Sequence, residues 1–177
     1  GRELTNVFPP KTNVPGDVVL EVQGITGMYN QLQDVTFNAR KGEILGLAGL
    51  ESSGRSETLE SIFGIRTRKS GTIALDGKPC FNRSAQESIK NGFSLLTEER
   101  RATGIFGVLD IKANTVISSL KRHKRFGVYL SEKSQREDTQ RYIDAMRTKT
   151  PSQDTKIRSL SGGNQQKVII GRWLLTD

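Results

Sequence analysis

The segment Leu160-Ser161-Gly162-Gly163-Asn164-Gln165-Gln166-Lys167 is the most informative feature of this 177-residue chain. An apolar run, Val168 to Leu175, follows it directly and predicts that a helix begins at the serine–glycine turn. Such a turn leaves the first backbone N–H groups of the helix uncovered, with the positive end of the helix dipole behind them. The glycines also let a ligand approach the main chain closely. The segment therefore predicts an anion site that suits a phosphate group.

The composition is typical of a soluble, globular chain, with 34% hydrophobic and 26% charged residues. No apolar run reaches the roughly 20 residues that a membrane-spanning helix needs. A single cysteine, Cys80, excludes an internal disulfide framework and is typical of a reducing compartment. The net charge of +8 permits nucleic acid, anionic lipid headgroups or nucleotide phosphates as partners.

The densest basic run is Lys121 to Arg125, with Phe126 and Tyr129 as its only nearby aromatic residues. A solvated surface loop is favoured over a nucleic-acid site for this run. His123 is the only histidine of the chain. It has no Cys, Asp or Glu at ligand spacing, so a metal-binding role is not expected.

A second glycine segment, Gly49 to Ser56, has the spacing G-x-x-x-x-G-R-S. The apolar run 43–48 before it predicts a strand buried on both faces, and 56–63 predicts a helix. In loops of this kind backbone N–H groups surround phosphates, a lysine reaches the terminal ones and a Ser or Thr hydroxyl holds Mg²⁺. The candidate nucleotide-binding residues are Gly49, Ser52, Ser53, Gly54, Arg55, Ser56 and Glu57, and Ser56 is also a candidate metal ligand.

This loop departs from the usual pattern at several positions. Arg55 stands where lysine belongs, and a planar guanidinium is not equivalent to a compact ammonium at a tight phosphate site. Ser52 stands where such loops usually carry glycine. Glu51 and Glu57 bring carboxylates that repel a triphosphate. We expect a degenerate loop that binds nucleotide weakly and supports hydrolysis poorly.

The rest of the pattern predicts a β-rich first half and a mainly helical second half. Strands are expected at 18–22, 32–39, 71–75 and 93–96, and an Asp76-Gly77 hairpin turn follows the third of these. Ser84 to Glu87 forms a capping box for a short helix that ends near Gly92. Helices are expected over 110–120 and 131–147, and Pro151 lies in the connector before the final helix.

The octamer at Leu160 matches the signature motif of ABC-type ATPases in full, and the Gly49 loop lies upstream of it, as in that family. The chain is thus similar to an ABC transporter nucleotide-binding domain. Its segments 41–46, 97–101, 146–151 and 164–176 resemble the galactose/methyl-galactoside branch of the monosaccharide importers, and more broadly the ribose and xylose group. The resemblance implies an α/β fold, namely that of a truncated P-loop ABC ATPase domain. Such a domain would have an antiparallel β subdomain, a partial RecA-like parallel core and an α-helical signature subdomain.

The resemblance also implies roles for individual residues, with ATP and Mg²⁺ as cofactors. Tyr29 would stack on adenine, and Glu98 would replace the Q-loop glutamine that touches Mg²⁺ and the attacking water. Arg100 and Arg101 remain either phosphate or interface groups or solvated charges. The residues implied to contact ATP held by a partner domain are Ser161, Gly162, Gly163 and Gln165.

In this family two nucleotide-binding domains share one polypeptide, and the chain is similar to the second, whose phosphate loop carries arginine. We expect an inter-domain linker at 1–16, the β subdomain and first part of the P-loop core at 17–97, and the Q-loop-like segment, helical subdomain and signature helix at 98–177. The Walker B strand and its carboxylates are expected beyond Asp177. The chain is therefore expected to be a fragment that is inactive alone, although its parent is an ATPase.

The implied function is to couple ATP binding and hydrolysis to monosaccharide import. The expected partners are the first nucleotide-binding domain of the same polypeptide, permease subunits that meet residues 110–118 and, indirectly, a sugar-binding protein, with no nucleic acid. The expected location is peripheral, on the cytoplasmic face of the inner membrane. Two alternatives remain: an ABC-type ATPase that acts on nucleic acid or ribosomes, which the +8 charge would suit, and a non-catalytic interaction module.

Overall fold

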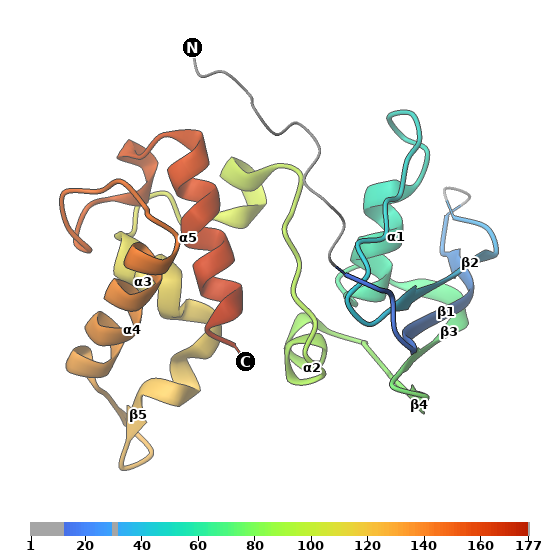
Figure 1. The fold of residues 1–177 in the computed structure, drawn as a ribbon, viewed down its shortest axis with the longest axis horizontal. Helices are drawn as coiled ribbons and strands as arrows, with labels where there is room; N and C mark the ends of the chain where they lie inside the picture. Colours follow the sequence, from blue (N-terminus) through green and yellow to red (C-terminus); the bar gives the residue numbers. More distant parts are fainter. Residues whose placement is uncertain (1–12, 30–31, 177) are drawn as a thin grey trace. The chain divides into compact units, whose positions relative to one another are not determined.

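The computed structural model describes residues 13–29 and 32–176, and its chain trace appears in Figure 1. The chain divides into two compact units, Gly1–Asn91 and Gly92–Asp177. Most of the predicted linker at 1–16 lies outside the described residues. The functional division expected at Thr97 stays a prediction.

The first unit contains an antiparallel sheet whose strands lie in the order β2-β1-β3-β4. Val22 and Ile25 of the central strand are fully buried, and Val22 lies opposite Ile73 in the register of β1 and β3. Asp76 and Gly77, both with positive φ, form the tight turn between β3 and β4, which confirms the predicted hairpin. The strands are β1 (Val18–Gly27), β2 (Val35–Arg40), β3 (Arg68–Leu75) and β4 (Lys78–Pro79).

Two short helices, α1 (Arg55–Ile62) and α2 (Ala85–Lys90), complete the first unit. The predicted cap of α2 is confirmed, because Ser84 Oγ accepts from the Glu87 N–H at 3.2 Å. The Glu87 carboxylate accepts in return from the Arg83 N–H at 3.0 Å. Ser88 Oγ donates to the carbonyl of Phe63 at 2.6 Å and so ties α2 to the end of α1.

Residues 43–48 and 93–96 form no strand, so these two predictions were wrong. Ile44 is 97% exposed, although a strand buried on both faces was expected there. A parallel strand obtains its hydrogen bonds from neighbours on both sides and its cover from helices on both faces. Within the described residues no strand pairs with either segment, and all strand pairs are antiparallel. The parallel core is thus not formed, whereas the α/β class with an antiparallel sheet and helices is confirmed.

The second unit is mainly helical, as predicted, and its helices α3, α4 and α5 pack on one another. Figure 1 shows α5, in red, running beside α3 and α4. Ile111, Ile157 and Val168 form the buried apolar cluster between them. The elements are a π-helical turn η1 (Arg100–Gly104), α3 (Ile111–Val116), a 3₁₀ helix η2 (Ile117–His123), the hairpin β5 (Lys124–Arg125) and β6 (Tyr129–Leu130), α4 (Glu132–Ala145), a 3₁₀ turn η3 (Ile157–Ser159) and α5 (Gly162–Leu174). No helix in the described ranges is long and apolar enough to cross a membrane.

A buried arginine, Arg172 of α5, joins three segments of this unit. Its Nε donates to the carbonyl of Asn114 at 2.6 Å and its Nη1 to the carbonyl of Gly104 at 2.8 Å. Its Nη2 donates to Asn114 Oδ1 at 3.1 Å, and its guanidinium lies 5.8 Å from the ring centre of Phe106. Burial lowers the pKa of Arg172. Arg172 has no acidic partner among the described residues. Main-chain and amide oxygens therefore stabilise its charge inside the unit.

The basic run 121–125 corrects one expectation. Its four cationic residues are exposed, as a solvated segment requires, but His123 between them is fully buried. His123 Nδ1 lies 3.0 Å from Ser134 Oγ and 4.0 Å from the Asp138 carboxylate. Burial lowers the pKa of His123, the Asp138 carboxylate opposes this shift and Arg122 adds to it. The imidazole is thus held neutral because η2 ends against α4.

Replacing Arg172 with Met should destabilise the helical unit by about 2–4 kcal/mol, because three buried oxygen acceptors lose a charged donor. Trp173 is the only tryptophan of the chain, so urea unfolding followed by its fluorescence reports on this unit. The matched control is Arg158→Met, at an exposed arginine of the same unit, which should change the free energy of unfolding by less than about 0.5 kcal/mol. Equal effects at the two positions would contradict a central role for Arg172.

The helical unit should lose stability in mild acid through His123. Its folded-state pKa lies below the unfolded value of about 6.5, so its contribution is complete above that pH and is lost as the pH falls through the folded value. Between pH 7 and pH 5, the free energy of unfolding of the unsubstituted chain should therefore fall further than that of His123→Gln. Trp173 fluorescence during urea unfolding measures both. Parallel pH profiles would show that this histidine titrates alike in the folded and unfolded states.

Candidate functional site

Among the α-helices in the described part of the chain, α1 and α5 have no N-cap side chain that accepts from a main-chain N–H, and these helices follow the two glycine segments. A helix N-terminus without such a cap suits an anion. The other three helices are capped by Ser84, Asp110 and Ser131, whose side chains accept from main-chain N–H groups at 3.2, 2.7 and 3.3 Å.

The phosphate-type loop turns sharply into α1 at Gly54. Gly54 has a φ of 92°, and its carbonyl accepts from both the N–H and the Oγ1 of Thr58, at 2.8 and 2.7 Å. A Cβ added at Gly49 would meet the Ser53 hydroxyl, which would have to rotate away. Ser52 has a φ of 63°, in the left-handed region that favours glycine. The serine that replaces the usual glycine is thus in a strained conformation.

The exposed side chains of the loop present both signs of charge. Arg55 opens α1 and is exposed, and Glu57 follows in the same first turn. Glu57 is favourable for the helix dipole but repels an incoming phosphate. The donor set suits phosphate groups, and its charge pattern opposes tight binding.

A cavity of about 400 Å³ lies beside this turn within the first unit. Tyr29, 77% exposed, lines it together with Glu57. An aromatic side chain and the first turn of α1 therefore border one cavity. The other lining residues are Gly27, Met28, Leu32, Ile65, Arg66 and Thr67.

The signature turn presents Ser161 and Gly163 to solvent. Ser161 is exposed, and its Oγ accepts from Asn164 Nδ2 at 3.1 Å. A Cβ added at Gly163 would meet nothing within 4 Å, so no internal contact requires glycine there. A Cβ at Gly162 would lie 2.3 Å from the Arg100 guanidinium. The end of the Arg100 side chain can move, so this contact does not require glycine at 162, and Gly163 leaves room for a ligand.

The structure places Gln165 inside the helical unit, although the sequence suggested a contact with phosphate. Its Nε2 donates to the carbonyls of Leu160 and Ile157, at 3.0 and 3.3 Å. Its Oε1 accepts from Arg100 Nε at 3.3 Å. The amide therefore holds the turn that precedes the helix, and Arg100 braces the same turn from η1. The sequence left the role of Arg100 open because its partners lie more than 60 residues away, as its 65-residue separation from Gln165 shows.

The two candidate magnesium ligands belong to different units. Ser56 lies in the first unit, and Glu98 is an exposed residue of the second, just before η1. Arg101 is exposed as well. Within residues 13–29 and 32–176, no cluster of three or more His, Cys, Asp or Glu side chains could hold a metal ion. A magnesium site shared by Ser56 and Glu98 stays a prediction.

Relatives of known role match along the whole chain. It is 56% identical over 178 residues to the galactose/methyl galactoside import ATP-binding protein MglA of Mannheimia succiniciproducens, and it covers 35% of that protein. It is also 56% identical over 178 residues to MglA of Vibrio vulnificus, of which it covers 36%. In both comparisons 100% of this chain is aligned. The chain thus spans about a third of the length of these curated relatives.

Solved structures match the fold. The ADP conformation of MJ1267, an ATP-binding cassette of an ABC transporter, has a TM-score of 0.73 and 19% identity, with 90% of this chain and 65% of that one covered. The dimeric ATP-binding cassette MJ0796 with ADP and Pi has a TM-score of 0.70 and 20% identity, with 89% and 69% covered. At such identities the likeness shows the fold alone. Residues 32–177 match the family model described as ABC transporter, and the chain belongs to the ABC transporter family.

Proposed function

We propose that this chain is an ATP-binding domain of an ABC importer for monosaccharides such as galactose, and that it corresponds to the second nucleotide-binding domain of a two-domain polypeptide. The observation that carries the proposal is the pair of uncapped helix N-termini at the two glycine segments. The sugar is inferred from the MglA relatives, which are galactose/methyl galactoside import ATP-binding proteins. The arginine at position 55 supports the assignment to the second domain.

In the first unit, the proposed nucleotide site combines the Gly49–Ser56 loop with the cavity at Tyr29. The Tyr29 ring would stack on the base, since its face is exposed at the cavity. Loop N–H groups and Arg55 would hold the phosphates, and the Ser56 hydroxyl would hold Mg²⁺. Bound ATP supplies the phosphoryl group whose transfer to water drives transport. Strain at Ser52 and repulsion from Glu57 make this a weak site.

The main proposed role of the chain, compared with its own weak nucleotide site, is to complete the ATP site of the first nucleotide-binding domain. Gly163 in the first turn of α5 costs up to about 1 kcal/mol of helix stability relative to alanine, and no internal contact explains it. Close approach of a phosphate to the main chain explains it. Ser161, Gly162 and Gly163 would therefore donate to the γ-phosphate, and Gln165 and Arg100 would position them through the preceding turn.

The proposed partners beyond the first domain are permease subunits and, indirectly, a sugar-binding protein. The protein would then lie at the cytoplasmic face of the inner membrane as a peripheral subunit. Most of the expected permease-contact segment 110–118 belongs to α3, whose residues Ile111, Asn114, Thr115 and Val116 are buried in the helical unit. A permease contact in this segment is thus left to its partly exposed positions, such as Lys112 and Ile117.

The chain should bind MgATP weakly, and titration calorimetry measures this directly. Ser56→Ala should abolish detectable binding, because the serine hydroxyl is the proposed magnesium ligand. Glu57→Thr should tighten binding about fivefold or more, since it removes a negative charge from the helix start. Ser70→Ala, at an exposed serine of β3, is the control and should bind like the unsubstituted chain. Binding that survives Ser56→Ala would contradict the proposed phosphate site.

In the two-domain polypeptide, Ser161→Ala should lower the rate of ATP hydrolysis about tenfold or more, because it removes a donor to a charged phosphate. Arg55→Ala should cost much less, since its own loop contributes little turnover. Steady-state phosphate release measures both variants. Gly163→Ala is the control for folding. Its free energy of unfolding in urea should be unchanged or slightly higher, and it should still slow hydrolysis. Equal losses for Ser161→Ala and Arg55→Ala would indicate two working sites.

A further inference from the structure

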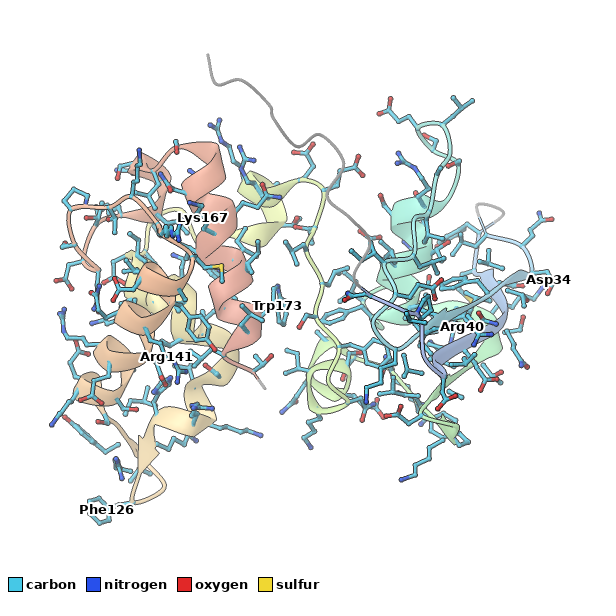
Figure 2. The ribbon with its side chains drawn as sticks, viewed as in Figure 1. Asp34, Arg40, Phe126, Arg141, Lys167 and Trp173 are labelled. Carbon is cyan, nitrogen blue, oxygen red and sulfur yellow. The ribbon has the colours of Figure 1, made fainter. Side chains whose placement is uncertain are left out.

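The hairpin β5–β6 in the helical unit has an anchored base and an exposed tip. Residues 124–130 leave η2 at His123 and return to the start of α4. At the base, the Ser131 N–H donates to the carbonyl of His123 at 2.9 Å, and the buried His123 ring contacts Ser134 of α4. The hairpin is therefore a fixed projection of the unit, and Figure 2 shows Phe126 at its tip, directed away from the helices.

The tip exposes apolar side chains. Phe126 is 100% exposed, Val128 88% and Tyr129 65%. Phe126 also has a φ of 51°, in the left-handed region where a bulky residue is uncommon. No packing within the described residues compensates this conformation, because the whole side chain is in solvent. The exposed Phe126 ring is therefore available to a partner outside the unit.

Cations surround this apolar tip. Lys124 and Arg125 form β5, and Lys121 and Arg122 precede it in η2. All four are exposed, and no acidic residue occurs between 121 and 130. Arg122 approaches Asp138 of α4 at 3.4 Å, whereas Lys124 and Arg125 have no acidic partner within the described residues. The charge of the hairpin therefore complements an anionic surface.

We propose that the β5–β6 hairpin docks on the surface of an anionic lipid bilayer, with Phe126 and Val128 inserted at headgroup level and Lys121, Lys124 and Arg125 against lipid phosphates. Aromatic and apolar side chains beneath a ring of Lys and Arg are the composition that binds at a membrane interface. Each basic residue near an anionic surface contributes to this attraction, which salt screens. Apolar insertion and electrostatic attraction would both contribute to the binding of the hairpin to the bilayer.

The apolar composition of the tip favours lipid over nucleic acid. A single-stranded nucleic acid stacks its bases on aromatic rings held on a platform, beside a groove that follows the backbone. Here the apolar group includes Val128 and Leu130 beside the two aromatic residues, and aliphatic side chains offer no face for stacking. Acyl chains need no such geometry. Docking on lipid would act in addition to any contact with permease subunits.

Co-sedimentation of the full chain with vesicles tests this proposal, and it needs neither nucleotide nor a permease. Vesicles of phosphatidylcholine with about a third phosphatidylglycerol should bind the chain, vesicles of phosphatidylcholine alone should bind it far less, and salt should weaken the binding. Lys124→Gln with Arg125→Gln should weaken binding about tenfold or more. Phe126→Ser with Val128→Ser should also weaken it about tenfold, without changing the net charge.

The control for net charge is Lys69→Gln with Lys78→Gln, two exposed lysines of the sheet unit, which removes the same charge elsewhere. This variant should retain at least half of the affinity for anionic vesicles. An equal loss in the control and in Lys124→Gln with Arg125→Gln would mean diffuse attraction by the +8 chain and would overturn the proposal. Circular dichroism and Trp173 fluorescence establish that each variant is folded.

Binding to a fluorescent single-stranded oligonucleotide is measured in parallel. If the hairpin variants lose oligonucleotide binding while vesicle binding is absent or unchanged, the hairpin is a nucleic-acid contact and the lipid proposal fails. Sedimentation without vesicles that depends on Phe126 would identify self-association of the chain and would overturn it as well. A failed vesicle test leaves the ATP-binding results intact, since those are measured by calorimetry without lipid.

Discussion

The hydrogen bonds of Arg172 are the constraint on which the helical unit depends. One side chain on α5 satisfies main-chain carbonyls of α3 and η1 as well as the Asn114 amide. Asn114 in turn bonds with the main chain of Phe106, so the loop between η1 and α3 is held through the same residue. Burying a charge without an acidic partner is costly unless its donors are satisfied, and here the main chain satisfies them.

The position of the signature turn follows from this arrangement. Arg172 fixes the C-terminal half of α5, and Tyr142 of α4 donates to the carbonyl of Leu174 at 2.7 Å. At the other end, Arg100 and Gln165 fix the turn before the helix. Ser161 and Gly163 are thus held at the rigid end of a helix that is braced along its length. In the proposed function such positioning would favour phosphate binding, because little ordering would be left for the moment of binding.

The N-termini of α1 and α5 differ in their neighbouring charges and in backbone strain. At the signature turn, no acidic residue lies in the first turn of α5, whereas Glu57 lies in the first turn of α1. Ser52 adds backbone strain to the loop before α1, and Gly163 leaves open space at α5. The two uncapped helix N-termini therefore differ in the charge and in the backbone strain beside them.

Features that depend on local chemistry could be predicted from the sequence alone. The Asp76-Gly77 turn, the Ser84 cap and the helix after Ser161 depend on φ preferences and on hydrogen bonds between residues close in the chain, and all three were predictable. The glycine segments located the candidate site for the same reason. The family resemblance rested on these segments and is confirmed by the match over residues 32–177.

Features that depend on partners distant in the chain became visible only in the folded structure. The apolar run 43–48 has the composition of a buried strand, yet no strand in the described part of the chain pairs with it, and Ile44 is exposed. His123 lies in a basic run that is polar in sequence, yet packing against α4 buries it. Arg172 interrupts an apolar helix, and only the fold brings it to Asn114, 58 residues away. Burial and long-range hydrogen bonds are set by which segments meet in space, and local sequence carries no direct record of that.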